Sequence, residues 1–453
     1  MQINRITGSF QLKTTVLAIL ILALLAQSRA QTFSVIHNFT DSPGGPGYNG
    51  GIVVYNGVLY GVTEHGGTNA TGSIFKMNPD GSGYRVLKTF SPQEGQYQTN
   101  TDGASPYGRL TVSGNMIYGS AYYGGYWGWG TIFSLTTNGD NFTVLKVFTN
   151  DLNPRVLEPA QGSDPVSRLV LVGKLLYGTV TGPTGGLFCM NTNGTGFTII
   201  TNIIGTAPSG DLILDGDTFY GINYETVYSI KTNGTDYFPI VIWATNNISF
   251  PSGITLGGNT VYGECYSGGS GSGMIFRVNT DGSGCEVLRS FGQSDGVWLT
   301  SSLVLYSNTL YGATYMEGPQ YFGTVYQMNT NGSGFAVIEG FSGNSSGQFP
   351  EGDIALSGHT LYGFTLQGGT NNEGVVYSMD VTPIVAHISY SKHMLDLKWN
   401  TLSNHVYQLQ FTTNLNSGWL NLGSSVTAKS NSISTTMAPG GGMQQFYRIN
   451  LVQ

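Results

Sequence analysis

The sequence predicts an all-β fold: a seven-bladed β-propeller closed by its N-terminal strand and followed by a small C-terminal β-sandwich. Three observations lead to this prediction. Only 9% of the 453 residues are charged, whereas 67 are glycine and 27 are tyrosine, a composition that suits short strands and tight turns. An aromatic-glycine signature recurs seven times, at intervals of 42 to 59 residues. A strand motif found late in the repeats also stands before the first repeat and is missing from the last.

Residues 1–30 have the pattern of a cleavable signal peptide. Arg5 and Lys13 precede the apolar run Val16–Ala26, and Ser28 and Ala30 are small residues at the two positions that a signal peptidase recognises. We expect cleavage after Ala30 and a mature protein that is secreted or extracytoplasmic, in the periplasm or at the cell surface. The alternative is an uncleaved membrane anchor, but the apolar run is about half as long as a bilayer-spanning helix.

The charge balance limits the partners of the mature protein. Cleavage removes three basic residues and no acidic ones, so the formal charge changes from −7 to −10, with 15 basic residues (18 minus 3) against 25 acidic residues. A surface with this charge repels nucleic acid. We expect no nucleic-acid partner, no transmembrane segment after signal cleavage, and a monomer.

Seven repeats fill residues 31–382. Each divides into four strand-like runs, which in the first repeat are Gly51–Tyr55, Val58–Thr63, Ser73–Asn78 and Tyr84–Phe90. Asn-Gly or Asp-Gly pairs between the third and fourth runs accept positive φ and predict hairpin turns. Repeats of this length with four short strands are typical of propeller blades. The seven signatures are Leu59-Tyr60-Gly61, Ile117-Tyr118-Gly119, Leu176-Tyr177-Gly178, Phe219-Tyr220-Gly221, Val261-Tyr262-Gly263, Leu310-Tyr311-Gly312 and Leu361-Tyr362-Gly363.

The fourth-strand motif predicts how the array closes. It appears as Phe33–Phe39 ahead of the first repeat and is absent after the last third strand, Val375–Asp380. If the N-terminal strand completes the last sheet, the ring closes and no edge pair stays exposed. The alternative is an open solenoid, or an arc of seven units with a frayed leading strand.

Residues 383–453 lack the aromatic-glycine signature, but apolar and polar residues still alternate there as in β-strands. Met394–Trp399 and Val406–Phe411 alternate apolar and polar residues, and a turn-rich stretch and further strands follow. We predict a β-sandwich of about 70 residues.

The three cysteines are an odd number, so they can form at most one disulfide. Cys265 and Cys285 share the fifth repeat but lie on strands that a third strand separates, too far apart for a bond. We therefore expect these two cysteines and Cys189 to be buried free thiols.

The run from Leu59 to Leu87, with its Tyr-Gly, Gly-Gly and Asn-Pro-Asp-Gly-Ser-Gly elements, resembles the Gloeo/Verruco, or GloVer, tandem repeat of exported bacterial proteins. The resemblance covers about residues 33 to 380. The third and fourth repeats depart from it, since Thr181–Gly186 is abbreviated and Tyr224-Glu225 replaces the Gly-Gly loop. The resemblance implies secretion and a repeat scaffold, and it supplies no catalytic residues. Relatives are often of the choice-of-anchor type, whereas this chain ends with no apolar span and no basic tail.

Loop lengths predict which face of the propeller binds. In a ring of four-stranded blades, the connections from second to third strand and from fourth to next first strand emerge on one face. Here these connections are long, as in Ala121–Gly130 and Ser91–Tyr107, whereas the opposite face has tight turns such as Asn56-Gly57. Long loops on a rigid scaffold commonly carry binding. We call the face with the long connections the long-loop face.

Charged residues gather at one level of the predicted central channel. Aligned first strands place four charged residues at matching positions, where other repeats have Gly51 and Ser302. Because charges are rare in this chain, we interpret the level as a candidate polar ligand site. The alternative is that the charges pair with one another or stay hydrated. The four residues are Arg109, Arg168, Asp211 and Asp353.

The second candidate site is an aromatic loop between the second and third strands of the second repeat. It holds Tyr122, Tyr123, Tyr126, Trp127 and Trp129 among glycines. Glycines cannot bury these rings locally, so we expect some to be exposed and able to stack on sugar rings or to grip a partner. Packing between adjacent loops is the alternative. The binding hypothesis predicts that replacing Trp127 and Trp129 with Ala lowers glycan binding and leaves thermal stability unchanged.

Catalysis has little support in the sequence. The six histidines and three cysteines form no His-x-x-x-His or Cys-x-x-Cys pair, so we predict no metal, no cofactor and no catalytic residue. Glu64, Glu264 and Glu317 lie in equivalent loop regions and could form an acid pair if two loops converge, as in glycoside cleavage.

Two functional hypotheses follow. The favoured one is a non-catalytic exported protein that presents its loop face to polysaccharide or to a surface protein. The alternative is a propeller carbohydrate-active enzyme, a glycoside hydrolase or lyase. An enzyme would need two carboxylates, or a carboxylate with Arg or Tyr, converging in one cleft on the long-loop face.

Overall fold

The structure is a computed structural model, and every regular element in its described part is a β-strand, so the predicted all-β class is confirmed. No helix among the described residues is long and apolar enough to cross a membrane. The predicted signal peptide lies outside the described residues. These are 32–40, 50–95, 98–149, 163–182, 185–201, 210, 212–223, 226–242, 248–268, 271–382, 386–391, 394–400, 406–412, 420–429, 432–437 and 446–451.

The chain divides into two compact units, one of which is Thr32–Asp380. In its described part the strands form seven antiparallel sheets. The first sheet contains β2 (Ile52–Tyr55), β3 (Val58–Thr63), β4 (Ser73–Met77) and β5 (Arg85–Thr89). The second contains β6 (Ala104–Ser113), β7 (Met116–Tyr123), β8 (Thr131–Thr136) and β9 (Thr143–Val147). The third contains β10 (Ser163–Pro165), β11 (Val170–Val172), β12 (Leu175–Thr181), β13 (Gly186–Asn191) and β14 (Thr198–Thr201).

The remaining sheets continue in chain order. The fourth contains β15 (Ile213–Asp215), β16 (Thr218–Ile222), β17 (Thr226–Lys231) and β18 (Phe238–Ile242). The fifth contains β19 (Ile248–Gly257), β20 (Thr260–Gly268), β21 (Met274–Asn279) and β22 (Glu286–Ser290). The sixth contains β23 (Val297–Leu299), β24 (Val304–Tyr306), β25 (Thr309–Met316), β26 (Thr324–Asn329) and β27 (Ala336–Gly340). The seventh contains β28 (Gln348–Ser357), β29 (Thr360–Gln367), β30 (Val375–Asp380) and β1 (Phe33–Asn38).

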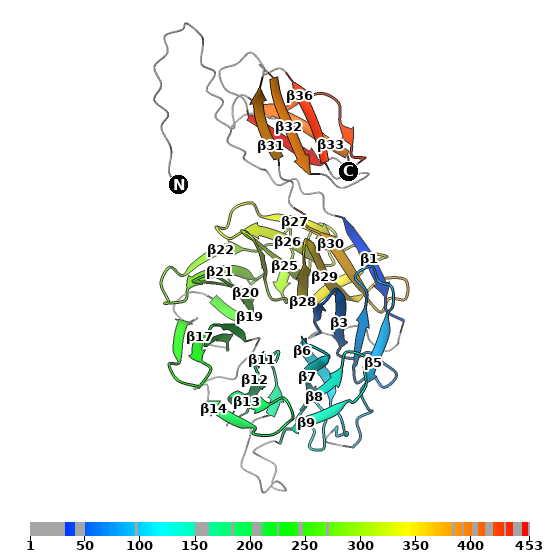
Figure 1. Cartoon of the computed structure of the whole chain (residues 1–453), viewed down its shortest axis with the longest axis vertical. Coiled ribbons are helices and arrows are strands. Elements are labelled where there is room, and N and C mark those ends of the chain that lie inside the picture. Colours follow the sequence, from blue (N-terminus) through cyan, green and yellow to red (C-terminus); the bar gives the residue numbers. More distant parts are fainter. Residues whose placement is uncertain are drawn as a thin grey trace. The chain divides into compact units, whose positions relative to one another are not determined.

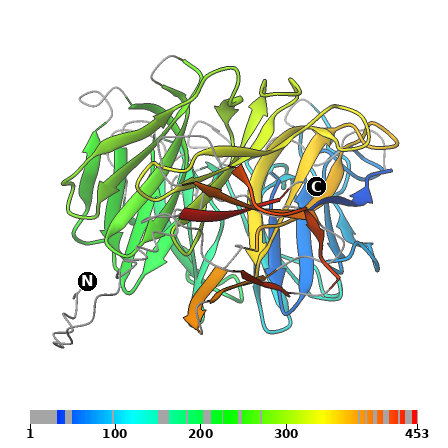
Figure 2. The same ribbon diagram turned by 90° about the horizontal axis from the view of Figure 1, so that it is seen from above.

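The sheets of this unit follow one another around a ring, with first strands such as β6, β19 and β28 toward the middle and fourth strands such as β5, β9 and β22 toward the outside (Figure 1). In the view at right angles, many strands run from one face of that ring to the other (Figure 2). The architecture is therefore propeller-like. Even the repeat that lacks the Gly-Gly loop forms a four-stranded sheet, β15 to β18.

The N-terminal strand pairs with the last repeat, as the sequence predicted. β1 lies antiparallel to β30, with Phe33 opposite Met379 and Asn38 opposite Val375. Beyond the strand, the amide of Thr370 donates to Asn38 Oδ1 at 2.9 Å across a separation of 332 residues. The two ends of the unit thus share one sheet.

The glycine of the signature makes room for an aromatic ring on the neighbouring strand. Gly61 pairs with Phe75, and a Cβ at Gly61 would lie 2.3 Å from Phe75 Cζ. Gly119 and Phe133 repeat the arrangement in the second sheet, with 2.5 Å to Phe133 Cζ. Because the ring covers the glycine, any side chain at this position would displace the core of the sheet.

The hydrophobic cores lie between neighbouring sheets. In one cluster, Tyr60 and Val62 of β3 join Leu110 of β6, Ile117 of β7 and Phe133 of β8. Each sheet therefore buries its faces against the sheets before and after it, which explains why a single repeat would not be stable alone.

The predicted hairpin turns are present. In the turn after β4, the amide of Gly81 donates to the Asn78 carbonyl at 2.9 Å, and Gly81 has a φ of +84°. Asp80 Oδ1 accepts a hydrogen bond from the amide of Ser82 at 3.0 Å. The Asn-x-Asp-Gly-Ser chemistry thus serves the turn itself.

The second unit lies within Val381–Gln453. Its described strands form two small sheets, and Leu395, Trp399, Tyr407 and Ile449 from both sheets share one buried cluster. The strands are β31 (Ala386–Ser391), β32 (Met394–Asn400), β33 (Val406–Thr412), β34 (Leu420–Asn421), β35 (Val426–Thr427), β36 (Ser432–Met437) and β37 (Phe446–Leu451).

All three cysteines are free thiols, as predicted. Cys265 on β20 is buried, and β21 separates it from Cys285. Cys189 and Cys285 are only partly buried, so the expectation of burial was wrong for these two. Burial raises the pKa of the Cys189 and Cys285 thiols, which lowers their reactivity.

Candidate functional site

The loops between second and third strands share one turn geometry. After β7, the amides of Gly128 and Gly130 donate to the carbonyls of Gly125 and Gly124 at 3.2 and 3.0 Å. After β25, the amide of Gly323 donates in the same way to the carbonyl of Glu317, also at 3.0 Å. The Gly-Gly signature is therefore explained by positive φ in this turn.

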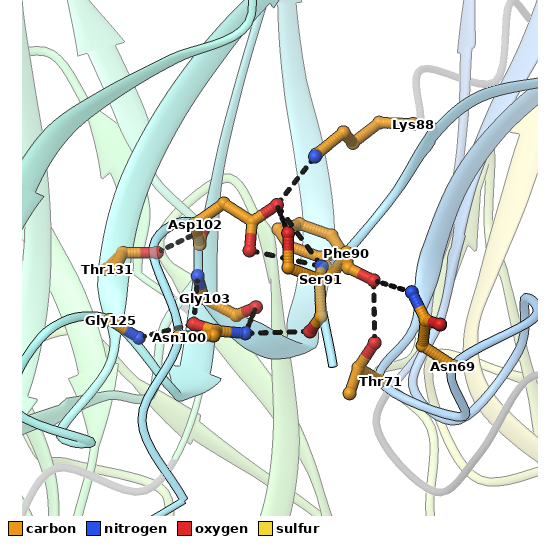
Figure 3. Close-up of polar contacts among 10 residues, drawn as sticks. All are labelled: Asn69, Thr71, Lys88, Phe90, Ser91, Asn100, Asp102, Gly103, Gly125 and Thr131. Atoms are coloured by element: carbon orange, nitrogen blue, oxygen red, sulfur yellow. Dashed lines mark hydrogen bonds and ion pairs between the residues drawn. The ribbon is translucent and has the colours of Figure 1, made fainter. Parts of the chain in front are cut away.

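Hydrogen bonds fix the long connection between the first and second sheets (Figure 3). The Asp102 carboxylate accepts from Lys88 Nζ at 2.6 Å and from the Ser91 amide at 3.1 Å. Asn100 Nδ2 donates to the Ser91 carbonyl at 2.9 Å, and Asn100 Oδ1 accepts from the Gly125 amide at 2.8 Å. Because Gly125 belongs to the aromatic loop, this network ties that loop to the scaffold.

The same clamp recurs between the fifth and sixth sheets. Arg289 Nη2 lies 2.6 Å from Asp295 Oδ2, and Thr324 Oγ1 donates to the Asp295 carbonyl at 2.9 Å. In the second sheet Thr131 Oγ1 donates to the Asp102 carbonyl at 3.1 Å (Figure 3). The long connections are thus held by an Asp at an equivalent position, which gives the long-loop face a rigid base.

The structure places Tyr122 and Tyr123 at the end of β7, so their assignment to the loop was wrong, and only the other three rings follow the strand. The five rings of this segment divide into exposed and packed ones. Tyr126 is 71% exposed and Tyr123 is 43% exposed. Trp127 is half-buried and meets the Tyr126 ring edge to face at 4.7 Å. Tyr122 packs against Tyr123, with ring centres 4.6 Å apart. Two tyrosines therefore carry most of the accessible aromatic surface of this loop.

Trp129 is partly buried and packs against the core between the second and third sheets. It packs on a buried cluster that includes Phe148 and Phe188, and its carbonyl accepts a hydrogen bond from the Asp164 amide at 3.1 Å. This packing argues against the expectation that replacing Trp129 leaves stability unchanged, since removing a packed indole opens a cavity.

Two of the four residues of the predicted charged level, Arg109 and Asp353, form an ion pair. Arg109 Nε lies 2.7 Å from Asp353 Oδ2, and the Ser302 amide donates to Asp353 Oδ1 at 2.9 Å. A Cβ at Gly51 would lie 2.6 Å from Arg109 Cγ, so glycine lets the arginine side chain pass across the first sheet. Arg168 lies between β10 and β11 and is partly buried, whereas Asp211 falls outside the described residues.

The pKa of Asp353 reflects this pairing. Burial alone would raise the pKa, but the charge of Arg109 and hydrogen bonds from Arg109 and Ser302 hold it below its ordinary value. The structure therefore shows, for Arg109 and Asp353, the alternative in which the charges satisfy each other. A ligand would have to compete with this pair.

The three glutamates from which an acid pair could form differ in their exposure to solvent. Glu264 is fully buried, and Tyr326 donates its hydroxyl hydrogen to Glu264 Oε1 at 2.5 Å. Burial raises the pKa of Glu264 well above its ordinary value. Glu264 is thus enclosed between the fifth and sixth sheets, out of reach of a substrate, while Glu64 and Glu317 stay partly accessible.

A buried carboxylate that sequence reasoning missed lies on β28. Glu351 is only 9% exposed, and burial together with the nearby charge of Glu64 raises its pKa well above the ordinary value. Its position follows Pro350, as Tyr107 follows Pro106 in the second sheet. That alignment is the signal that could have placed Glu351 beside the charged level.

An aromatic ladder, also missed, crosses the fifth, sixth and seventh sheets. It consists of Tyr266, Trp298, Tyr315 and Phe349. Ring centres lie 5.7 Å apart between Tyr266 and Trp298, 6.1 Å between Trp298 and Tyr315, and 5.1 Å between Tyr315 and Phe349. Tyr266 and Tyr315 each stand three residues after the signature glycine, as Tyr122 does. That these rings stack can be seen only once it is known which sheets lie next to each other.

Motifs for metal and nucleophile chemistry find no support in the described part of the chain. No group of His, Cys, Asp and Glu there could hold a metal ion. Gly292–Gly296 and Gly343–Gly347 fit a Gly-x-Ser-x-Gly pattern, but both connect two strands. A nucleophile elbow requires a strand followed by a helix, so these stretches are connections of the scaffold.

These sheets and loops define a repeat-built all-β protein with a propeller-like fold. The chain belongs to the Gloeobacter/Verrucomicrobia repeat family, whose model matches residues 25–235 and 223–398. This match confirms the family resemblance that the repeats predicted. No curated protein sequence matches the chain.

Several solved structures match the chain. An oligogalacturonate lyase from Vibrio parahaemolyticus has a TM-score of 0.50 at 12% identity, over 78% of this chain and 97% of the lyase chain. The extracellular domain of a protein assigned to the one-component systems of B. thetaiotaomicron has a TM-score of 0.49 at 11% identity, over 82% of this chain and 46% of that chain. A gluconolactonase from Xanthomonas campestris has a TM-score of 0.42 at 11% identity, over 80% and 94%. At 12% identity, the similarity to the lyase supports a shared fold and says nothing about a shared activity.

Proposed function

We propose that the chain is an exported, non-catalytic binding protein that presents a rigid loop face to polysaccharide outside the cytoplasm. In this proposal residues 31–382 form a seven-bladed β-propeller closed by the N-terminal strand, and residues 383–453 form a β-sandwich. The leader pattern of residues 1–30 and membership of the repeat family support export.

One observation carries the binding proposal. Tyr123 is exposed at the end of β7 and Tyr126 on the loop that follows, and the backbone of this loop is hydrogen-bonded through Gly125 to Asn100. Exposed rings on a fixed loop lose little conformational entropy on binding, and their flat faces suit the apolar faces of sugars. A solvated, flexible loop would not give the same advantage.

A glycan array tests the proposal. The mature protein is expected to retain a subset of polysaccharides, and Tyr126→Ala is expected to weaken that binding at least tenfold while the melting temperature stays the same. Phe238→Ala is the matched control, because Phe238 is 44% exposed on the outer strand β18 and lies away from the loops. Equal loss in both variants, or no retained glycan, would contradict the proposal.

A second candidate is a carbohydrate-active enzyme. The raised pKa of Glu351, caused first by burial and then by the charge of Glu64, favours it, because a general acid must keep its proton. Incubation of the retained polysaccharide with the protein should then release new reducing ends or unsaturated products, and Glu351→Gln should abolish the release. Intact polysaccharide after incubation supports the binding protein.

A further inference from the structure

A carboxylate stands on β27 at a position where other fourth strands carry a cation. In the first, second and fifth sheets, the residue opposite the second position of the third strand is Lys88, Lys146 or Arg289. The sixth sheet has the same register, with Glu339 opposite Val325. The repeat therefore exchanges a positive side chain for a negative one at this single contact between sheets.

Each of the three cations lies over an aromatic ring of the following sheet. Lys88 Nζ is 4.6 Å from the centre of the Phe142 ring, and Lys146 repeats this arrangement in the next sheet. Arg289 Cζ is 3.5 Å from the centre of the Phe335 ring. A cation over the face of an aromatic ring is attracted by the negative charge of that face. The rings between the sheets thus form a receptor for lysine or arginine.

The rings beside Glu339 have the same arrangement. Phe142 meets Phe90 edge to face with ring centres 6.0 Å apart, and Phe33 on β1 meets Phe341 edge to face at 5.7 Å. Phe33 also lies 5.6 Å from Tyr377 at an interplanar angle of 30°, and Phe142 lies at 5.6 Å and 28° from the corresponding ring of its own sheet. The contact between the sixth and seventh sheets therefore keeps the rings and lacks the cation.

The acid that accompanies the cation is exchanged as well. Lys88 Nζ lies 2.6 Å from Asp102 Oδ2, and the amide of Ser91 donates to the same carboxylate. The corresponding amide between the sixth and seventh sheets, that of Ser342, donates to Ser346 Oγ at 3.2 Å. A serine thus replaces the aspartate where a glutamate replaces the lysine. The two exchanges leave this contact with one acid and no base.

Glu339 is partly buried, and no basic nitrogen lies within ion-pair distance of its carboxylate among the described residues. Burial raises the pKa of Glu339 to about 7, so most of these carboxyls are ionised only above neutral pH. Tyr377 stays neutral there, because burial and the charge of Glu339 raise its pKa. A cation placed beside Glu339 would favour the ionised carboxylate and lower its pKa.

We propose that Glu339 and Phe33 form a binding site for a lysine side chain of a partner protein. The ammonium of that lysine lies over the Phe33 ring, as Lys88 lies over Phe142, and pairs with the Glu339 carboxylate. Lysine is the occupant because the same ring arrangement holds lysines of this chain in the first two sheets. The formal charge of −7 favours a basic partner.

This site is separate from the loops that the proposed function uses. β27 and β1 lie toward the outside of the ring of sheets (Figure 1). A partner protein therefore meets the outer edge of the sixth and seventh sheets, whereas the exposed rings Tyr123 and Tyr126 belong to the second sheet and its loop. The inference stands whether or not the chain binds polysaccharide.

A titration with a lysine peptide tests the site. The probe is acetyl-Gly-Lys-Gly-amide, and its binding to the mature protein is followed by nuclear magnetic resonance at pH 8. The comparison peptide carries Nε-acetyl-lysine, which keeps the alkyl chain and has no charge. We expect the lysine peptide to bind at least tenfold more tightly. Glu339→Gln should weaken its binding at least tenfold, and Asp215→Asn, which removes an exposed carboxylate at the end of β15, should leave it unchanged.

A double variant gives a second test that does not depend on Glu339→Gln. Glu339→Lys with Ser346→Asp rebuilds the pair that Lys88 forms with Asp102 in the first contact. Its own lysine should then occupy the place over Phe33, so the melting temperature should rise and binding of the lysine peptide should be lost. A lower melting temperature would show that these rings do not accept a lysine and would overturn the inference.

Three results of the titration would also overturn it. Equal binding of the two peptides would show that the charge of the ammonium is not recognised. Equal loss in Glu339→Gln and Asp215→Asn would show general attraction to an acidic protein. Binding of glucosamine as tight as that of the lysine peptide would indicate a site for small amines in place of a protein lysine. Retention of glycans through Tyr126 is a separate result in each case.

Discussion

Two carboxylates on β28 lie two residues apart and have opposite surroundings. Asp353 is paired with Arg109 and accepts a hydrogen bond from the Ser302 amide, and these contacts lower its pKa. Glu351 is also buried, but Glu64 is a like charge and the pKa of Glu351 is raised. The comparison teaches that one inner strand carries both an ion pair, which joins neighbouring sheets, and a buried carboxyl with one oxygen that has no hydrogen-bond partner among the described residues.

Removing Asp353 should have the largest effect. Asp353→Ala leaves the Arg109 guanidinium mostly enclosed without its partner, which is expected to cost about 3 kcal/mol of unfolding free energy. Urea unfolding measures the change. The double variant with Arg109→Ala should recover part of it, because no unpaired charge then remains. A loss below about 0.5 kcal/mol, which is typical of surface substitutions, would show that the pair is solvated.

The next largest difference in stability is expected between replacing a packed ring and replacing an exposed ring of the aromatic loop. Trp129→Ala is expected to cost about 3 kcal/mol because it empties part of a buried cluster, whereas Tyr126→Ala should change stability by less than about 0.5 kcal/mol. Thermal unfolding of the two variants side by side checks this. Similar melting temperatures for both would mean that Trp129 does not belong to the core.

Glu264 should make stability depend on pH. Its pKa is raised by burial, so the folded protein binds the proton more tightly than the unfolded chain, and this contribution is complete below the ordinary value of 4.5. It is lost as pH rises through the folded value, by at most about 1.4 kcal/mol per pH unit. Glu264→Gln should unfold with a weaker pH dependence than the parent protein as the pH rises above 4.5. Parallel curves would show that Glu264 does not hold an extra proton.

Glu351→Gln should have the smallest effect and the opposite sign to Asp353→Ala. Replacing a buried carboxyl that faces a like charge is expected to leave stability unchanged or to raise it by about 1 kcal/mol near neutral pH. Guanidinium unfolding in the absence of saccharide measures it. Destabilisation comparable to that of Asp353→Ala would remove the contrast between the two carboxylates.

The sequence predicted the features that follow from aligning the repeats with one another. Tyr-Gly signatures located the second strands, and the alignment of first strands brought Arg109, Asp353 and Ser302 together. It did not predict the ladder or Glu351, because stacking of Tyr266 on Trp298 depends on which strands of successive sheets face each other. It also grouped Trp129 with the other rings of the aromatic loop, since local glycines say nothing of a neighbouring sheet against which the indole packs.

Completion of the last sheet by the N-terminal strand is the central claim, since it joins the sheets that carry Glu64 and Glu351. Ser34 and Ser378 lie opposite each other in the pairing of β1 with β30. A protein with Ser34→Cys and Ser378→Cys should form a disulfide between these two positions on mild oxidation. Peptide mass mapping identifies the bridge, and the melting temperature of the oxidised form should be higher than that of the reduced form. Two cysteines that stay separately reactive toward maleimide, with no bridged peptide, would contradict the claim.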